Sequence, residues 1–341
     1  MLFLKTANKD RLFIGLLLFY LVGGYNVQAQ TSNSFASLQL PSFAKIAGLG
    51  GVNASLYNGE NSFFLYNPAL LSEDGNDHLS LSYAVLPGGA GLSNANYNFN
   101  ISKLGTFGAG LQYISYGAIQ GYDNTGAPTQ EFTPNDFTFT IAHARQANNF
   151  RLGASLKFVN ANINGYNGNA ILFDLGGVFI HPLKDFTVGM TIKNFGLITS
   201  EFSAASQTSL PFDVQIGTSI KPEHLPIRIS VTLHQLQKWN LMNAGEEIFS
   251  LNTTLDNIFR HVVLGAELLL NDHVSILAGY NQLRRKDLRL DTKGGFSGFS
   301  IGTSISVQAF KLVYALGGYH VSGNTSTFTL AANLSQITTK K

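Results

Sequence analysis

HLSLSYAVL, residues 78–86, alternates apolar side chains with small or polar ones over its whole length. Leu79, Leu81, Tyr83 and Val85 fall on one face of an extended chain, opposite serine and alanine. Side chains of a β-strand point to opposite faces in turn, so this period of two predicts a strand with one apolar face.

The same alternation recurs along the chain and predicts about 14 strands. At roughly 9 to 12 residues each, the strands are long enough to cross a bilayer when tilted. They are expected at 78–86, 95–103, 106–116, 136–144, 149–160, 169–180, 186–195, 211–221, 227–237, 261–270, 273–282, 295–306, 309–320 and 325–334. The predicted fold class is all-β: a transmembrane outer-membrane β-barrel of antiparallel strands with a small N-terminal plug.

The connections between these segments alternate in length. Short ones include Leu104-Gly105 and Val307-Gln308, whereas longer ones fall at 117–135, 196–210, 238–260 and 283–294. Outer-membrane barrels have short periplasmic turns and longer external loops. The alternation therefore favours a barrel that begins in the periplasm over a soluble β-sandwich, although the short external connection 320–324 departs from it. Within 238–260, helical spacing at 251, 255 and 258 predicts a short helix over the barrel mouth.

Composition agrees with a membrane barrel. The chain has 26 Phe, 13 Tyr and 35 Gly, against 12% charged residues. It has no cysteine, which excludes disulfides and thiolate metal sites. No segment after the first 29 residues is apolar enough for a transmembrane helix, which takes about 20 residues.

The first residues have the pattern of a signal peptide. A basic start is followed by an apolar core over 12–24, and Val27-Gln28-Ala29 offers a small-residue cleavage site. Without residues 1–29 the chain carries 19 basic and 19 acidic residues, and this neutrality argues against nucleic-acid binding. We expect a signal peptide at 1–29, a plug segment at 30–74 and the barrel at 75–341.

The plug segment is dense in small residues. It contains PSFAKIAGLGGVNASLYNGENSFFLYNPALL, residues 41–71, in which glycines allow close backbone approach and Asn-Pro interrupts regular structure. A compact segment of this kind ahead of a strand series predicts a plug packed inside the closed barrel. Its motif residues are Lys45, Leu49, Gly50, Gly51, Asn67, Pro68 and Ala69.

Charged residues interrupt several strands. Asp174, Arg228, Lys157, Arg151 and Glu267 stand in segments otherwise poor in charge. A charge on the lipid face costs about 2–4 kcal/mol at mid-depth, so most of these should face the lumen. Glu267 is the hardest to place, because both faces of 262–270 are largely apolar. We favour ion pairs that hold the plug over a catalytic role.

The motifs for catalysis are incomplete. Ser42 and Lys45 match S-x-x-K, but the S-D-N and K-T-G elements of that chemistry are missing. The eight histidines are scattered and show no H-E-x-x-H spacing. We therefore predict no enzyme activity and no catalytic, cofactor or metal residues, while a site assembled across strands stays open.

A basic cluster falls in one predicted external loop. It consists of Arg284, Arg285, Lys286, Arg289 and Lys293. Such a cluster is suited to lipopolysaccharide phosphates or to an acidic partner surface. The alternative is a solvated loop balanced by Asp287 and Asp291.

These features together resemble FadL-like outer-membrane barrels. Within them the chain is similar to the PorV/PorQ group of the type IX secretion system, and nearest to the PorQ pattern. Leu40-Pro41, Lys45, Leu49-Gly50-Gly51 and Asn67 to Leu71 occupy the places of that pattern. Lys45 stands where arginine is expected and Gly48 where alanine is expected, which puts a bidentate contact there in doubt.

The resemblance implies a non-enzymatic outer-membrane component of the secretion system. Such a protein anchors the cell-surface attachment complex, together with a PorZ-like surface protein, a PorU-like sortase and a PorV-like barrel. The complex processes secreted cargo and links it to lipopolysaccharide. The alternative is a FadL-type transporter of fatty acids or other hydrophobic solutes, in which the plug gates the exit.

Overall fold

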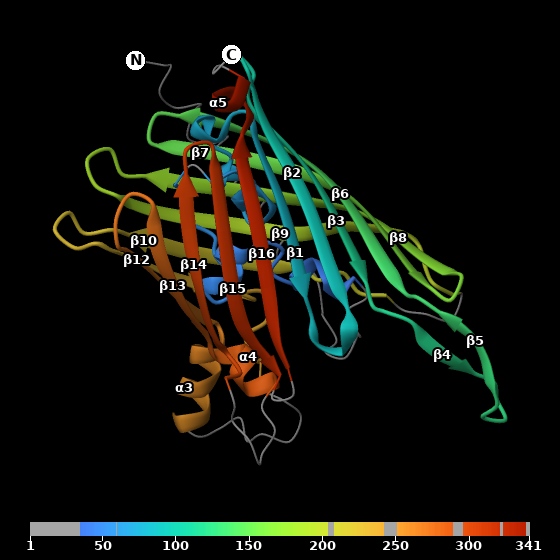
Figure 1. Ribbon diagram of the computed structural model, residues 1–341. Coiled ribbons are helices and arrows are strands. Elements are labelled where there is room, and N and C mark those ends of the chain that lie inside the picture. Colours follow the sequence, from blue (N-terminus) through green and yellow to red (C-terminus); the bar gives the residue numbers. More distant parts are fainter. Residues whose placement is uncertain are drawn as a thin grey trace, which may run out of the picture. The chain divides into compact units, whose positions relative to one another are not determined.

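The computed structural model describes residues 35–58, 60–203, 208–241, 251–288, 296–320 and 323–338. The predicted signal peptide lies outside these residues. Within the compact unit Asn33–Lys341, fourteen strands close into a barrel (Figure 1). Each strand pairs antiparallel with the next, and β1 pairs with β16 to close the ring. The predicted 14-stranded antiparallel barrel is confirmed.

The barrel strands are β1 His78–Val85, β2 Gly91–Ile101, β3 Gly105–Ser115, β6 Asn135–Ala147, β7 Phe150–Ile163, β8 Tyr166–Ile180, β9 Phe186–Ser200, β10 Asp213–Ile220, β11 Ile227–Leu233, β12 Val262–Leu269, β13 Val274–Asn281, β14 Phe299–Val307, β15 Phe310–His320 and β16 Gly323–Asn333. The connections at the end where β1 begins are short, at 102–104, 148–149, 181–185, 221–226, 270–273 and 308–309. This is the end that the sequence assigns to the periplasm.

Side chains alternate between the two faces of the wall. On β1, Leu81 is 48% exposed and Tyr83 50%, whereas the intervening Ser80 and Ser82 are buried. Serine, threonine and asparagine dominate the buried positions of the other strands, and large apolar residues dominate the exposed ones. An apolar exterior around a polar interior is the pattern of a barrel in a membrane.

The loop 117–135 contains structure that the sequence did not predict. β4 (Ile119–Tyr122) and β5 (Pro128–Phe132) form a separate two-stranded sheet beyond the barrel end. At its tip, Asp123 accepts hydrogen bonds from the backbone of Thr125 and Ala127. This hairpin was missed because its strands are short and lack an apolar face.

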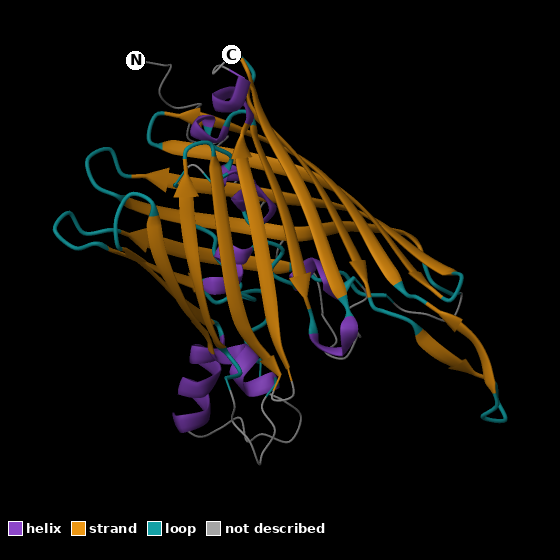
Figure 2. Ribbon diagram, in the orientation of Figure 1, coloured by secondary structure: helices purple, strands orange, loops and turns teal. Residues whose placement is uncertain are grey.

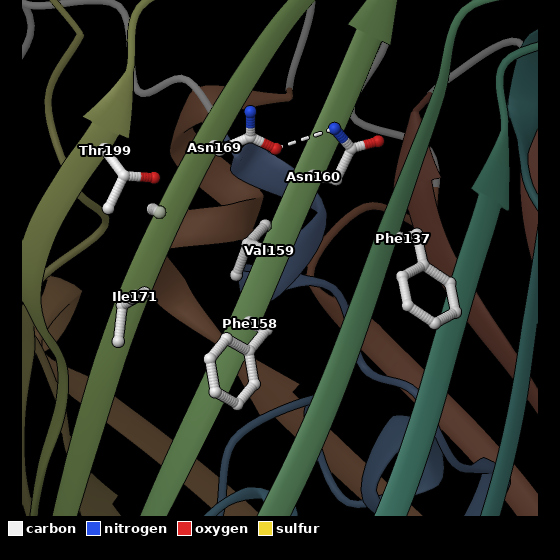
Figure 3. A pocket seen from close by; sticks show the side chains of 8 residues that line it. Phe137, Phe158, Val159, Asn160, Asn169, Ile171 and Thr199 are labelled. Atoms are coloured by element: carbon white, nitrogen blue, oxygen red, sulfur yellow. Dashed lines mark hydrogen bonds between the residues drawn. The ribbon is translucent and has the colours of Figure 1, made fainter.

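The predicted loop at 161–168 is also wrong, because β7 and β8 continue to a tight turn at 164–165. Asn164 and Gly165 both have positive φ, at 50° and 86°, as hairpin turns require. On the outer face of β7 and β8, the side chain of Asn160 donates a hydrogen bond to that of Asn169, and Asn162 donates one to Asn167, each at 2.8 Å. Figure 3 shows the first pair beside Phe158 and Ile171, with which it lines a shallow pocket. Polar side chains therefore occupy outward positions at this level of β7 and β8, below a turn at which Ile163 and Tyr166 are again exposed.

Four further strand ends differ from prediction by four or five residues. β2 begins at Gly91 rather than 95 and β9 ends at Ser200 rather than 195, whereas the other two strands are shorter than predicted. β11 ends at Leu233 rather than 237, because Gln235 adopts a φ of 54° that breaks the strand. β14 begins at Phe299 rather than 295, after Gly298 at a φ of 82°. Neither backbone reversal has a distinctive sequence signal.

The helices lie in the plug segment and at the strand ends (Figure 2). They are η1 Ala36–Gln39, α2 Ala44–Gly48, η2 Asn61–Leu65, η3 Pro68–Leu70, η4 Glu73–Gly75, η5 Pro87–Gly89, α3 Leu251–Arg260, α4 Gln282–Asp287 and α5 Leu334–Thr338. The helix predicted within 238–260 is confirmed as α3. In the described part of the chain, no helix is long and apolar enough to cross a membrane.

The plug segment lies inside the barrel. Its helix α2 packs against β13 to β16, while η3 packs against β6 to β8 on another part of the wall. Nearly every residue from 41 to 56 is buried. A segment that contacts separate parts of a closed wall while its own side chains are buried fills the space between them.

The outward face of the barrel strands can be tested as a lipid-facing surface by placing an arginine at two different depths. Ile141→Arg places a charge at the middle of β6 on an outward position that is 44% exposed. We expect it to lower the free energy of unfolding in lipid vesicles by about 2–4 kcal/mol. Phe150→Arg, at the periplasmic end of β7, should cost about 0–1 kcal/mol. Equal costs at the two positions in urea titrations would contradict the assigned depth.

Candidate functional site: the plugged lumen

Lys45 lies at the centre of a buried ion cluster. Its side chain is 2% exposed, and its Nζ lies 2.7 Å from a carboxylate oxygen of Glu60 and 2.7 Å from one of Glu267. Lys45 is in α2 and Glu60 is in the same plug segment, whereas Glu267 belongs to β12. The contact therefore joins the plug to the wall by charge.

Three more residues extend this cluster toward the periplasmic end. Arg228 on β11 lies 3.2 Å from Glu267 and 2.8 Å from Asp185, and Lys311 on β15 pairs with Glu60. Cations and anions alternate, so each buried carboxylate contacts two cations. Glu267 faces the lumen after all, which resolves its ambiguous position in the sequence.

Leu49, Gly50 and Gly51 form a backbone contact with the opposite end of the wall. The Gly50 N–H donates a 3.1 Å hydrogen bond to the Oγ of Ser300, and that hydroxyl in turn donates to the carbonyl of Gly48 at 3.0 Å. A Cβ on wall residue Gly279 would lie 2.1 Å from the Gly50 nitrogen. Glycine on both partners thus allows backbone to touch backbone.

The Asn-Pro-Ala motif makes a second such contact. Asn67 is fully buried, caps η3 by accepting from the Ala69 N–H at 3.0 Å, and donates to the carbonyl of Ala54 at 2.7 Å. A Cβ on Gly176 of β8 would lie 1.9 Å from the Asn67 oxygen. On β7, a Cβ on Gly153 would lie 2.4 Å from the carbonyl carbon of Pro68. The motif is seated between two wall glycines.

A separate charged cluster surrounds a bulge in β9. Lys157 lies 2.6 Å from Asp174, and the two side chains hold Asn194, which has a φ of 57°. The register between β8 and β9 shifts here. Lys193, which directly precedes Asn194 in β9, places its ammonium 5.2 Å from the ring centroid of Tyr66 in the plug segment. This cluster joins wall to plug as well.

The sequence placed these charges only in part. Lys157, Asp174 and Arg151 are buried inside the barrel, as expected of charged strand residues. Glu60, Lys311, Lys193 and Asn194 were missed. One signal was available: Lys45 and Glu60 are the only charged residues between 41 and 71, and opposite charges in a buried segment pair with each other.

The three described members of the basic cluster each contact a different part of the structure. The guanidinium of Arg284 packs on Gly51, where a Cβ would lie 2.3 Å from it. Arg285 lies over the ring of Phe299 at 5.5 Å, and Lys286 pairs with Asp256 of α3 at 3.1 Å. Arg289 and Lys293 lie outside the described residues. Arg284 thus contacts the plug, and a role of the cluster toward lipopolysaccharide or an acidic partner stays a prediction.

The lumen offers little acid–base chemistry. Ser42 donates its hydroxyl to Gln112, while the ammonium of Lys45 is held between two carboxylates. The S-x-x-K pair therefore does not assemble a nucleophile and its base. Among the described residues, no cluster of three histidine, aspartate or glutamate side chains is arranged to hold a metal ion.

Solved structures of similar fold include a toluene transporter and a monoaromatic hydrocarbon channel. The toluene transporter TodX of Pseudomonas putida matches with a TM-score of 0.52 at 13% identity, over 86% of this chain and 96% of TodX. The protein has the fold of an outer-membrane barrel. A TodX monoaromatic hydrocarbon channel mutant gives 0.51 at 13% identity, over 86% and 97% of the two chains. A FadL homologue of Pseudomonas aeruginosa gives 0.45 at 12%, over 85% and 97%.

Comparison of the sequence alone identifies no relative of this chain. No family model matches the chain, and no curated protein matches it. At 13% identity the likeness to TodX concerns the fold. The location follows from that fold: a multi-pass barrel of the outer membrane.

The ion cluster predicts a large effect of removing its central cation. Lys45→Met leaves Glu60 and Glu267 with one cation each, Lys311 and Arg228, and breaking a buried ion pair costs about 3–5 kcal/mol. We expect the plug to become sensitive to protease from the periplasmic side, and conductance to appear in planar bilayers. Lys184→Met, at an exposed periplasmic turn, is the matched control and should change neither. A Lys45→Met variant as resistant as wild type would refute the role of the cluster.

A second prediction concerns pH. Burial alone would raise the pKa of Glu60, which lies outside the strands, but Lys311 and Lys45 lower it from 4.5 to about 2. Because the pKa is depressed on folding, the stabilisation is complete above pH 4.5 and is lost as the pH falls toward about 2. We expect plug protease sensitivity to rise only within this window. Lys311→Met should shift its onset to higher pH, and an unchanged onset would contradict the pairing.

Proposed function

We propose that this protein is a non-enzymatic outer-membrane anchor that acts through its external face, as a component of type IX secretion. The observation that carries the proposal is the way the plug is held. Buried ion pairs and glycine-lined backbone contacts fix it to β8, β12, β13 and β15 at once. An anchor needs a rigid, closed barrel, whereas a pore needs a plug that moves.

The external end supports the same proposal. Helices α3 and α4 contact each other and are linked through Asp256, which binds Lys286 and Gln282 of α4. Arg284 of α4 then packs on Gly51 of the plug. Helices α3 and α4 are thus connected to the plug, and they offer a surface to which a partner protein can bind.

The partners are taken from the sequence motif. The PorQ-like pattern around Lys45, Leu49-Gly50-Gly51 and Asn67 to Leu71 supports an attachment complex with a PorZ-like surface protein, a PorU-like sortase and a PorV-like barrel. Lipopolysaccharide would then receive the processed cargo. The β4–β5 hairpin is the external element that extends furthest from the wall in Figure 1, which makes it the first region to test for partner binding.

A second candidate is transport of a hydrophobic solute. The fold comparison favours it over anchoring, because the similar solved structures are described as a toluene transporter and a monoaromatic hydrocarbon channel. An apolar cluster on the inner face of β7 and β8 also suits such a solute. It comprises Phe35, Val159, Ala161, Ala170 and Leu172, with Leu38, Phe202 and Leu210 packed against it.

One experiment separates the two functions. The gene is deleted in its native host, and two quantities are measured: surface-attached cargo with a C-terminal secretion signal, and uptake of toluene and a long-chain fatty acid. If anchoring is correct, cargo is lost from the surface or remains unprocessed, and uptake is unchanged. Normal cargo with reduced uptake would replace the anchor by the transporter.

Complementation sharpens this test. A variant in which a short glycine-serine linker replaces residues 119–132 removes only a sheet that pairs with itself, so the barrel should fold and insert. We expect this variant to restore membrane insertion but not cargo attachment, with reduced recovery of a PorZ-like protein in pull-downs. Full restoration of cargo attachment would remove the hairpin from the proposed interface.

A further inference from the structure

The helix α3 buries its polar face and exposes its apolar face, which is the reverse of an ordinary surface helix. Its polar residues Asn257 and Arg260 are 4% and 0% exposed. Its apolar residues Leu255, Ile258 and Phe259 are 46%, 40% and 57% exposed. A surface helix normally buries its apolar face, so this face needs another apolar environment.

Contacts of the polar face show which way the apolar face is directed. Arg260 binds Asp256 at 2.9 Å and the carbonyl of Leu241 at 3.0 Å, while Asp256 reaches Lys286 of α4. Because α4 packs on Gly51 of the plug, the polar face of α3 is on the side of the lumen. At 100° per residue the apolar residues lie on the opposite side of the helix, away from the barrel mouth.

The wall beside α3 is too short for the membrane. β10, β12 and β13 have 8 residues each and β11 has 7, whereas β7 and β8 have 14 and 15. A spanning strand needs about 9–11 residues. Eight tilted residues cover on the order of 20 Å of an apolar band of about 25 Å. The membrane on this side therefore reaches beyond the external ends of these strands.

The exposed apolar residues continue the lipid-facing surface of the short wall. Leu264 and Leu268 face outward on β12, which begins two residues after α3 ends. Leu236 and Trp239 stand at the other end of the same connection, 41% and 67% exposed. The Trp239 ring stacks on His261 at a centroid distance of 6.0 Å, and its carbonyl accepts from Asn257. Tryptophan is enriched at the level of the lipid headgroups.

We propose that the apolar face of α3, together with Trp239, inserts into the outer leaflet at the border between headgroups and acyl chains. The occupant of this face is the lipid surface itself, because the face continues a lipid-contacting wall that is too short. The helix then supplies the missing part of the apolar band, and its polar face holds α4 over the plug. This inference is independent of which of the two proposed functions is correct.

The chain provides its own reporter, because Trp239 is the only tryptophan. The full-length protein is reconstituted in vesicles made with phospholipids brominated at a shallow or a deep acyl position. We expect blue-shifted emission, stronger quenching by the shallow bromines than by the deep ones, and little quenching by aqueous iodide. Two reference proteins calibrate the response in a Trp239→Phe background: Tyr83→Trp on the lipid face of β1, and Tyr122→Trp on the external hairpin.

A pair of variants tests the helix itself. Ile258→Gln with Phe259→Gln removes the apolar face while keeping good helix formers, and it should lower bromolipid quenching of Trp239 at least twofold. Thr254→Gln, at the edge of that face, is the matched control and should leave quenching unchanged.

Three outcomes would overturn the proposal. One is emission and iodide quenching equal to those of the Tyr122→Trp reference. Another is bromolipid quenching that the double glutamine variant does not reduce. The third is protection of Trp239 from iodide in native outer membranes but not in pure lipid vesicles, which would assign this face to a protein partner instead.

Discussion

The contact between Lys45 and its two carboxylates, Glu60 and Glu267, is the constraint on which the rest of the lumen depends. Buried charges are costly to remove from water, and only good geometry with complete pairing compensates for that cost. Here the pairing is complete because Arg228 and Lys311 supply the remaining cations. The cluster fixes α2 at one depth, and the glycine contacts above and beside it follow from that position.

The polar lumen is the complement of the plug rather than the lining of a water channel. Thr329 accepts from the backbone N–H of Ala44 at 2.9 Å, Thr187 donates to the carbonyl of Ser55 at 2.6 Å, and Asn94 donates to that of Ser42 at 3.0 Å. The plug backbone makes hydrogen bonds within its short helical turns, and its other buried backbone groups require partners elsewhere. Inward serine, threonine and asparagine side chains supply them, which explains why the wall keeps strict alternation.

The sequence determined the parts of this structure that rest on local periodicity. The fourteen barrel strands and helix α3 have repeating side-chain patterns, and the bounds of each were predicted within five residues. The short periplasmic connections follow from the same patterns. The register that brings Glu267 to Lys45 has no such signal, because it depends on how distant strands close around the plug. The αL bulge at Asn194 and the reversal at Gln235 are equally invisible, since non-glycine residues with positive φ are set by their tertiary contacts.

The unequal height of the wall connects these features to the external surface. On the tall side, β7 and β8 carry outward polar side chains at Asn160 and Asn169, and the β4–β5 hairpin lies beyond the barrel end. On the short side, α3 and α4 cover the mouth and rest on Gly51 through Arg284. If the proposed anchoring function is correct, the tall side is where we expect a protein partner to bind, because its polar groups already face water. The short side presents apolar residues at membrane level, and there lipid is the nearer and more abundant ligand.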